Sequence, residues 1–457
     1  MEFFFEPEGV AVVGATANKN KVGYSIIKNL IVGYRGEIYP VNPKYKEIEG
    51  KRCYSSISEI PDPVDLAIIF IPAPTVPGVV WECARRGIPG VMIQSAGFAE
   101  VGQEGRALQN EVVQIARQTG IRIWGPNCMG LVDAVRGHVF SFVSPVIWEE
   151  GLVPGKVSLV VQSGLLSAGF LIDIMSHGRT GISKACSIGN KADVDEADIL
   201  EYLINDPETH AIGLYIESIS EGPRFLELCR ASKKPIIVLK GGKTEKGARA
   251  AMSHTASMAG NAQVVTGALR QAGAIEANDF HQMADISKAL SMYPNIGRKG
   301  RRRVAILTFS GAAGIVSTDL MADKGLELAD LSEHTFSALK SVFPEWMPPS
   351  NPIDLWPAVE RSGPERAYGE AMKAVCADPG VDAIVVHLFI GGVMSKQLDI
   401  AALADITRKA EKPLFVWAIG TREELREFRI RTEGMGVPVY GEIERTLDAL
   451  AAVFHWR

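Results

Sequence analysis

The 457-residue sequence lacks the features that mark several classes of protein. Its six cysteines form no Cys-x-x-Cys pair, so neither a disulfide framework nor a metal site is indicated, and we expect reduced thiols. The net charge of -5 leaves no basic excess for binding nucleic acid. Prolines interrupt the longest apolar stretch, and acidic residues stand where a signal peptide needs basic ones. We therefore expect a cytoplasmic protein that binds neither membranes nor nucleic acid.

The sequence does contain many short runs of Val, Ile and Leu that alternate with longer amphipathic segments, as in GVAVVGAT, GEIYPVNP and VDLAIIFIP. Such runs are typical of parallel strands that helices cover on both faces. They predict an α/β fold with a Rossmann-like domain at 1–135 and two flavodoxin-like doubly wound domains at 150–294 and 301–457. The segment 136–155 has no clear period, and we interpret it as a linker.

The second and third segments resemble each other. Each opens with a strand ending in Ser-Gly, and each later has Asp-Pro before one strand and Lys-Pro before the next. Either they are two copies of one unit, or they share only the alternation of strands and helices that is general in α/β proteins. The first copy has Glu217 at a strand end, where the second has Phe389.

The first segment carries the pattern of a phosphate-binding turn. Gly14 follows the first strand and Gly23 opens the next helix, whose free N–H groups favour a phosphate. Thr16 replaces the second glycine of the dinucleotide fingerprint and no acidic residue ends the second strand, so a nicotinamide cofactor is disfavoured. Asn42 and Lys44 instead suit an adenosine ligand with an additional ribose phosphate, such as coenzyme A. The candidate CoA-binding residues follow the first four strands: Gly14, Ala15, Thr16, Val22, Gly23, Val41, Asn42, Lys44, Ile71, Pro72, Ala73, Pro74, Ser95, Ala96 and Gly97.

Six motifs in chain order carry a resemblance to a known family: IPAP, SAGF, GPNCMGLVD, PGKVSLVVQSG, SIGN and SHTASMAG. The chain resembles the α subunits of succinyl-CoA synthetase and, more closely, of the ADP-forming acyl-CoA synthetases. The resemblance implies a CoA-binding first domain, a second domain with a phosphorylated histidine, and a further ligase domain. The family's ATP-grasp domain has no counterpart here. The resemblance therefore implies an ATP-grasp β subunit as partner, in an α2β2 assembly, with Mg²⁺ and ADP or ATP bound on that subunit.

The SHTASMAG motif contains His254, which is surrounded by small residues. An imidazole can accept and release a phosphoryl group because it is a neutral nucleophile near pH 7. The resemblance implies that His254 is the phosphorylated residue and that Glu217 orients it through a hydrogen bond. It also implies that the helix openings at Ser163 and Gly164 hold the phosphate; a role for Ser310 and Gly311 is left open.

The acyl group is expected near the GPNCMG and SIGN motifs. Asn127 and the backbone around Cys128 and Gly189 offer hydrogen bonds to a carboxylate or acyl phosphate. We disfavour Cys128 as a nucleophile because no histidine lies near it in the sequence. His387, inside an apolar run, is interpreted as a core residue. The candidate phosphate and acyl residues are Asn127, Cys128, Gln162, Ser163, Gly164, Gly189 and Asn190.

These observations predict the α subunit of an ADP-forming acyl-CoA synthetase, with His254 and Glu217 as its catalytic residues. Two alternatives are a CoA-binding regulatory or scaffold protein without catalysis and a succinyl-CoA synthetase-type subunit. The sequence identifies neither the acid nor the preferred nucleotide.

Overall fold

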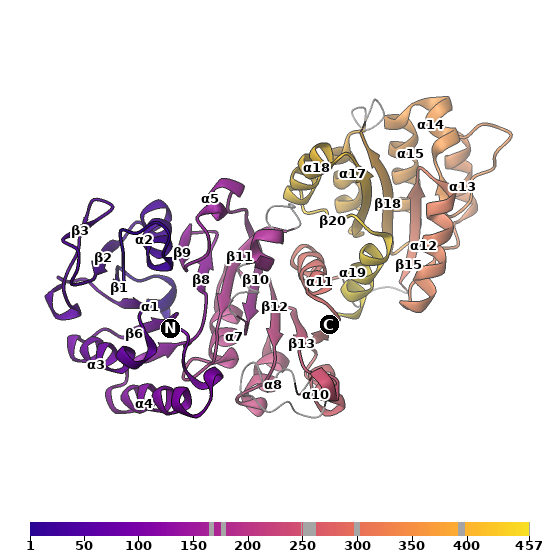
Figure 1. The fold of residues 1–457 in the computed structure, drawn as a ribbon. Coiled ribbons are helices and arrows are strands. Elements are labelled where there is room, and N and C mark those ends of the chain that lie inside the picture. Colours follow the sequence, from indigo (N-terminus) through magenta and orange to yellow (C-terminus); the bar gives the residue numbers. More distant parts are fainter. Residues whose placement is uncertain are drawn as a thin grey trace. The chain divides into compact units, whose positions relative to one another are not determined.

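The computed structural model describes residues 1–163, 169–174, 180–247, 249, 262–296, 302–391 and 398–456. They form three large sheets flanked by helices (Figure 1). The chain divides into two compact units, and the division falls inside helix α11 (Phe280–Met292), between Met283 and Ala284. The predicted α/β fold is confirmed.

The first sheet is entirely parallel in the described residues. Its order is β2 (Glu37–Val41), β1 (Gly9–Val13), β5 (Leu66–Ile69), β6 (Gly90–Ile93) and β7 (Arg122–Trp124). After β2 the chain crosses over β1 to reach β5, so the strand order reverses between β1 and β5. Doubly wound sheets bind ligands at such a switch point, beyond the carboxyl ends of the strands.

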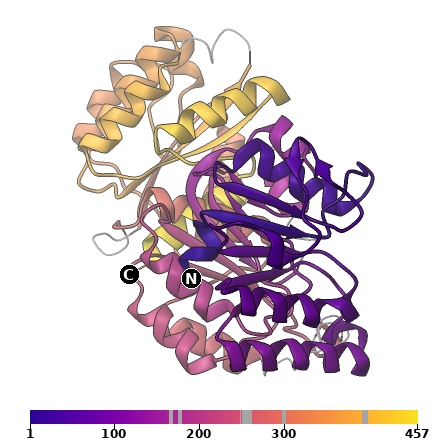
Figure 2. The same ribbon diagram turned by 90° about the vertical axis from the view of Figure 1, so that its left-hand side faces the viewer.

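Helices cover both faces of this sheet. Alternate residues of β1 point to opposite faces: Val10 and Val12 pack with helix α2 (Val22–Gly33), and Ala11 and Val13 pack with the core under α3 and α4. Figure 2 shows α3 and α4 lying side by side on their face. The remaining elements of this region are α1 (Glu2–Phe5), α3 (Val76–Arg86), α4 (Gln103–Thr119), the hairpin β3 (Glu47–Ile48) and β4 (Lys51–Arg52), and the 3₁₀ turns η1 (Ile57–Glu59), η2 (Ala73–Thr75) and η3 (Ala99–Val101).

The second sheet belongs to the same unit and has seven strands. Its order is β14 (Ile275–Glu276), β13 (Ile236–Lys240), β12 (Ala211–Ile216), β10 (Pro154–Val161), β11 (Ile182–Ser187), β8 (Gly130–Asp133) and β9 (His138–Phe140), as Figure 1 shows for all but β14. Strands β10 to β14 are parallel in flavodoxin order. Helices α7 (Glu196–Asn205), α8 (Gly222–Ala231) and α10 (Ala262–Gln271) pack on one face.

The segment 136–155, which we interpreted as a linker, contains strand β9 and helix α5 (Val146–Glu150). Strands β8 and β9 pair antiparallel with each other, and β8 pairs antiparallel with β11. A three-residue strand and a five-residue helix are too short to show a hydrophobic period in the sequence.

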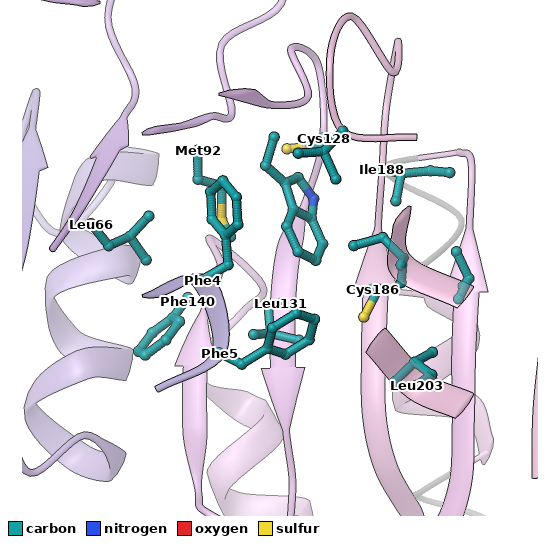
Figure 3. Packing of buried hydrophobic residues seen from close by; sticks show 14 of the residues in the cluster. Phe4, Phe5, Leu66, Met92, Cys128, Leu131, Phe140, Cys186, Ile188 and Leu203 are labelled. Carbon is teal, nitrogen blue, oxygen red and sulfur yellow. The ribbon is translucent and has the colours of Figure 1, made fainter. Parts of the chain in front are cut away.

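The core between these two sheets receives the N-terminal segment of the chain. Phe4 and Phe5 are fully buried, and the ring of Phe5 stacks on Tyr202 with 3.7 Å between centroids. Figure 3 shows both phenylalanines among Met92, Leu131, Phe140 and Cys186, which come from the two sheets. The indole N–H of Trp124 at the end of β7 donates to Ser187 O at the end of β11, at 2.7 Å. This packing brings the carboxyl ends of β7 and β11 together.

The third sheet forms the second unit. Its order is β16 (Glu327–Leu328), β15 (Arg303–Thr308), β18 (Ala383–Ile390), β19 (Leu414–Gly420) and β20 (Val439–Tyr440), with β17 (Ile353–Asp354) paired to β15. This parallel order matches that of β10 to β14, as the repeated sequence pattern predicts. The helices are α12 (Gly311–Asp323), α13 (Glu333–Lys340), α14 (Trp356–Ser362), α15 (Pro364–Ala377), α17 (Ile400–Lys409), α18 (Arg422–Gly434) and α19 (Ile443–His455).

All six cysteines are buried and free. Among the described residues, no helix is long and apolar enough to cross a membrane. The same residues contain no group of three histidine, cysteine or acidic side chains that could hold a metal ion.

Candidate active site

The turn after β1 depends on two glycines. Gly14 has a φ of +92°, and a Cβ there would lie 2.1 Å from Phe70 O, at the end of β5. Gly23 is the second residue of α2, and a Cβ there would lie 2.4 Å from Gly14 O. Glycine at both positions therefore lets α2 begin at the switch point, and the start of a helix favours a phosphate.

Asn42 connects the ends of β1 and β2. Its Nδ2 donates to Ala15 O at 2.7 Å, and its Oδ1 accepts from the Lys44 backbone N–H at 3.0 Å. Thr16 is within 3.1 Å of the Tyr45 hydroxyl. The Lys44 side chain is exposed at the rim. The structure thus gives Asn42 the role of shaping the turn and leaves the Lys44 cation accessible to a ligand.

The IPAP and SAGF segments are adjacent at the ends of β5 and β6. The backbone N–H of Ile71 donates to Ser95 Oγ at 3.0 Å. Gly97, with a φ of +107°, approaches Ala73 so closely that a Cβ would lie 3.0 Å from the alanine Cβ. The predicted CoA-binding residues after the first four strands therefore line one edge of the first sheet.

The GPNCMG and SIGN motifs lie in direct contact. A Cβ on Gly189 would lie 2.2 Å from Pro126 O and 2.6 Å from Asn127 O. The N–H groups of Asn190 and Ala192 donate to Pro126 O and Gly125 O, each at 2.9 Å. The two loops that were expected near the acyl group are therefore held together through their backbones.

Cys128 lies beneath these loops and is 1% exposed. Its thiol donates to Ile93 O at 3.4 Å, and burial raises its pKa to about 12. A buried thiol with this pKa carries almost no thiolate near pH 7, so the structure agrees with our interpretation that Cys128 is not a nucleophile.

Glu217 lies directly after β12 and is 4% exposed. Its Oε1 accepts from the Tyr215 hydroxyl at 3.1 Å, and its backbone N–H donates to Gln162 Oε1 at 2.8 Å. Burial, with the nearby Glu217 charge, raises the pKa of Tyr215, which keeps the phenol protonated as a donor. Gln162 thus fixes the backbone of Glu217, and Tyr215 fixes its carboxylate.

Two lysines hold the backbone at this strand end. The Lys240 ammonium donates to Glu217 O at 2.6 Å and also to Gly241 O. The Lys191 ammonium donates to Ser218 O at 2.8 Å and to Glu196 Oε2 at 2.7 Å. Burial lowers the pKa of Lys240, while the Glu217 charge opposes that shift. Two ammonium groups therefore fix the backbone of the turn after β12.

Two of the candidate residues, His254 and Gly164, lie outside the described residues. Ser163 follows β10 in the first unit. Ser310 and Gly311 belong to the second unit, where they form the N-cap and first residue of α12.

Comparison with known proteins identifies the family. Residues 8–134 match the CoA binding domain model, and residues 154–290 match the succinyl-CoA ligase like flavodoxin domain model. The α subunit of ADP-forming acetate–CoA ligase I from Pyrococcus furiosus is 37% identical over 100% of this chain and 97% of its own length. The chain belongs to the ADP-forming acyl-CoA ligase family.

Other members of this ligase family agree. ADP-forming acetate–CoA ligase II from Archaeoglobus fulgidus is 38% identical over 98% of this chain and 66% of that protein, so the chain spans about two thirds of it. The solved structure of dinucleotide-forming acetyl-coenzyme A synthetase 1 from Ca. Korarchaeum cryptofilum, in complex with phosphate and ADP, has a TM-score of 0.86 and 33% identity. The match covers 99% of this chain and 96% of the chain in the solved structure. The predicted resemblance is confirmed, and it favours a ligase over a CoA-binding regulatory protein.

Sequence reasoning missed four side chains at the candidate site: Lys191, Tyr215 and Lys240, and also Glu100, which accepts from Asn190 Nδ2 at 2.6 Å. Lys191 follows the SIGN motif directly, and Tyr215 is two residues before Glu217. Alternation in β12 places the side chains of positions 215 and 217 on the same face, and this signal was available in the sequence.

Proposed function

We propose that this chain is the α subunit of an ADP-forming acyl-CoA synthetase. With a partner, it converts acyl-CoA, phosphate and ADP into the acid, CoA and ATP, and the reaction is reversible. The observation that carries this proposal is the anchoring of Glu217 at the end of β12. Its carboxylate accepts from the Tyr215 hydroxyl and its backbone is held by Gln162 and Lys240, and a carboxylate fixed in this way can orient an imidazole.

The edge of the first sheet fits coenzyme A. The Gly14 turn and the amino end of α2 offer backbone N–H groups for the diphosphate, and the exposed Lys44 offers a cation for the ribose phosphate. The IPAP and SAGF segments would line the path of the pantetheine chain toward Asn127.

The chemistry divides into three transfers. A phosphate oxygen attacks the acyl carbon and the C–S bond breaks, releasing the CoA thiolate, which takes a proton from solvent. A ring nitrogen of His254 then attacks the phosphorus of the acyl phosphate, and the acid leaves as a carboxylate. Glu217 accepts the N–H of the other ring nitrogen, so that the attacking nitrogen carries its lone pair. The phosphoryl group finally passes to ADP.

The last transfer needs a binding site for ADP and Mg²⁺. We propose that an ATP-grasp β subunit supplies that site in an α2β2 assembly, where the metal ion neutralises charge between the phosphates. The small residues around His254 would allow its loop to reach both the acyl site and the partner's nucleotide site.

The test incubates the chain with acetyl-CoA and labelled phosphate, with and without the β subunit and ADP, and locates acid-labile label by mass spectrometry. We expect label on His254 with acetyl-CoA and phosphate alone, ATP only with the partner and ADP, and neither product in His254→Ala. Glu217→Gln should slow labelling about 10- to 100-fold, as loss of a positioning carboxylate typically does. The matched control Glu221→Gln changes an exposed glutamate four residues away and should leave labelling unchanged.

ATP formation by the chain alone would contradict the two-subunit proposal. Label on a different residue would contradict the role of His254, and an unchanged rate in Glu217→Gln would contradict that of Glu217.

A further inference from the structure

Glu100 lies in the 3₁₀ turn η3, just after the SAGF segment. Its Oε1 accepts from the backbone N–H groups of Gly97 at 2.6 Å and Phe98 at 3.1 Å. Burial raises the pKa of this carboxyl, but hydrogen bonds from Asn190 and from these N–H groups outweigh burial, and the net pKa is lowered. Glu100 is therefore an ionised group that only accepts hydrogen bonds.

The second oxygen of Glu100 fixes the amide of Asn190. Asn190 Nδ2 donates to Glu100 Oε2 at 2.6 Å and to Gln109 Oε1 at 3.0 Å. Because a carboxylate has no proton to donate, the amide nitrogen must face Glu100, and the amide oxygen must face away. Both N–H groups of Asn190 are thus engaged, which leaves only its oxygen for other partners.

That oxygen meets Asn127. Asn127 Nδ2 donates to Asn190 Oδ1 at 3.4 Å. The backbone of Asn127 is fixed independently: its N–H donates to Ser95 O at 3.0 Å, and its φ is +56°. Three segments that end β6, β7 and β11 therefore meet through a chain of polar contacts from Glu100 through Asn190 to Asn127.

We propose that Glu100 is a positioning residue for the acyl step, which sets the direction of the Asn127 amide through Asn190. This inference rests on the proposed function. One side-chain N–H of Asn127 is directed to Asn190. No described residue accepts a hydrogen bond from the second side-chain N–H, which can therefore donate to the acyl oxygen. This oxygen gains negative charge as phosphate attacks, so a fixed donor stabilises the transition state more than the bound ester.

Glu100→Gln tests the direction of this chain with little change in shape. The glutamine oxygen can still accept from Gly97 and Phe98, so the local turn keeps its hydrogen bonds. Its NH₂ group, however, would face the NH₂ group of Asn190. The Asn190 amide must then rotate so that its oxygen faces the glutamine NH₂ group. The Asn127 amide rotates in response, and its oxygen then points to the acyl site where an N–H had pointed.

The expected result is a split between kcat and KM. In the complete enzyme with its β subunit, acetyl-CoA, phosphate and ADP, Glu100→Gln should lower kcat about 10- to 100-fold. The KM for acetyl-CoA should change by less than about threefold, because the contacts that bind the ground state and the transition state equally are unchanged. Glu104→Gln, the same change at an exposed position of α4, is the matched control and should behave as the unmodified enzyme.

A second substitution tests the relay itself. In Glu100→Gln with Asn190→Asp, the glutamine NH₂ can donate to the new carboxylate, which can also accept from Asn127 Nδ2 once Gln109 turns its amide. The direction of Asn127 is then restored, and kcat should recover at least about tenfold over the single variant.

Three outcomes are distinguishable. If the unmodified complex makes no ATP from acetyl-CoA or from any other acyl-CoA offered, the proposed function fails. If that complex is active and Glu100→Gln keeps its kcat, Glu100 does not position the site. If the double variant is no better than the single one, the loss does not come from the direction of the amides, and the relay is refuted.

Discussion

Replacing Gly189 with alanine should separate the two loops to which we assign the acyl group. Gly189 has a φ of +58°, and its missing Cβ would lie 2.2 Å from Pro126 O. Contacts of a Cβ below 3.0 Å essentially do not occur, so the loops must move apart by at least about 0.8 Å. The neighbouring atoms are backbone, which cannot swing aside as a long side chain would.

The expected effect of Gly189→Ala has two parts, one on stability and one on rate. The positive φ alone costs an alanine roughly 1–2 kcal/mol, which lowers stability wherever it occurs. The displacement acts on geometry, because Asn190 N–H donates to Pro126 O at 2.9 Å, and this contact spans the same gap. A misplacement near 1 Å can cost about 10²-fold in rate. We therefore expect kcat/KM for acetyl-CoA to fall about 10²-fold.

Gly87→Ala separates the two parts. Gly87 has a φ of +81° at the end of α3, and no atom lies within 4 Å of its missing Cβ. It carries the backbone strain without the collision, so its melting temperature should fall slightly while kcat/KM stays within about twofold. The reasoning is refuted if Gly189→Ala retains kcat/KM within about threefold, or if Gly87→Ala loses as much.

Two further predictions concern charge. Lys44→Glu should weaken CoA binding in calorimetry while dephospho-CoA is affected less; equal affinities of the unmodified chain for CoA and NAD would contradict the CoA assignment. Burial lowers the pKa of His387 to about 4 from an ordinary 6.5, so the unfolded chain binds more protons between these values, and stability is lost as pH falls from about 6.5 to about 4. The loss reaches about 3 kcal/mol; His387→Gln should flatten this part of the pH dependence of melting, and an unchanged slope would contradict the burial argument.

Much of the edge that we assign to CoA could be predicted from the sequence because it is a consequence of topology. Parallel strands place all their carboxyl ends at one edge, so Gly14, Ile71 and Ser95 meet although about 80 residues separate the first from the last. The glycines there are also locally recognisable, since a tight turn into a helix demands them.

The side chains that support the site could not be predicted in the same way. Glu100 meets Asn190 across 90 positions of sequence, and Lys240 reaches Glu217 across 23. The first contact depends on the packing of two sheets against each other and the second on the pairing of β12 with β13, and no local period reports either. Charged residues next to a motif are usually solvated, so nothing in the sequence singled out Lys191. In the structure its side chain is 4% exposed and its ammonium contacts Glu196 and Ser218.

The two flavodoxin-like sheets differ at the residues to which we assign the phosphoryl chemistry. Aligning their strands, in which β12 corresponds to β18 and β10 to β15, equates Gln162 with Phe309, Tyr215 with His387 and Glu217 with Phe389, while β13 and β19 equate Lys240 with Ala418. Each polar group that holds Glu217 is thus replaced together with the carboxylate itself.

His387 cannot take the place of this carboxylate. Its side chain is fully buried. Because the Thr308 hydroxyl donates to Ser310 O, Thr308 Oγ1 must accept from His387 Nδ1–H. Since Nε2 is then left to accept from Ser317, the ring stays neutral and enclosed. The third sheet therefore has the same strand order with Phe389 at the position of Glu217, and the proposed orientation of His254 depends on four residues that are found in the second sheet and not at the aligned positions of the third.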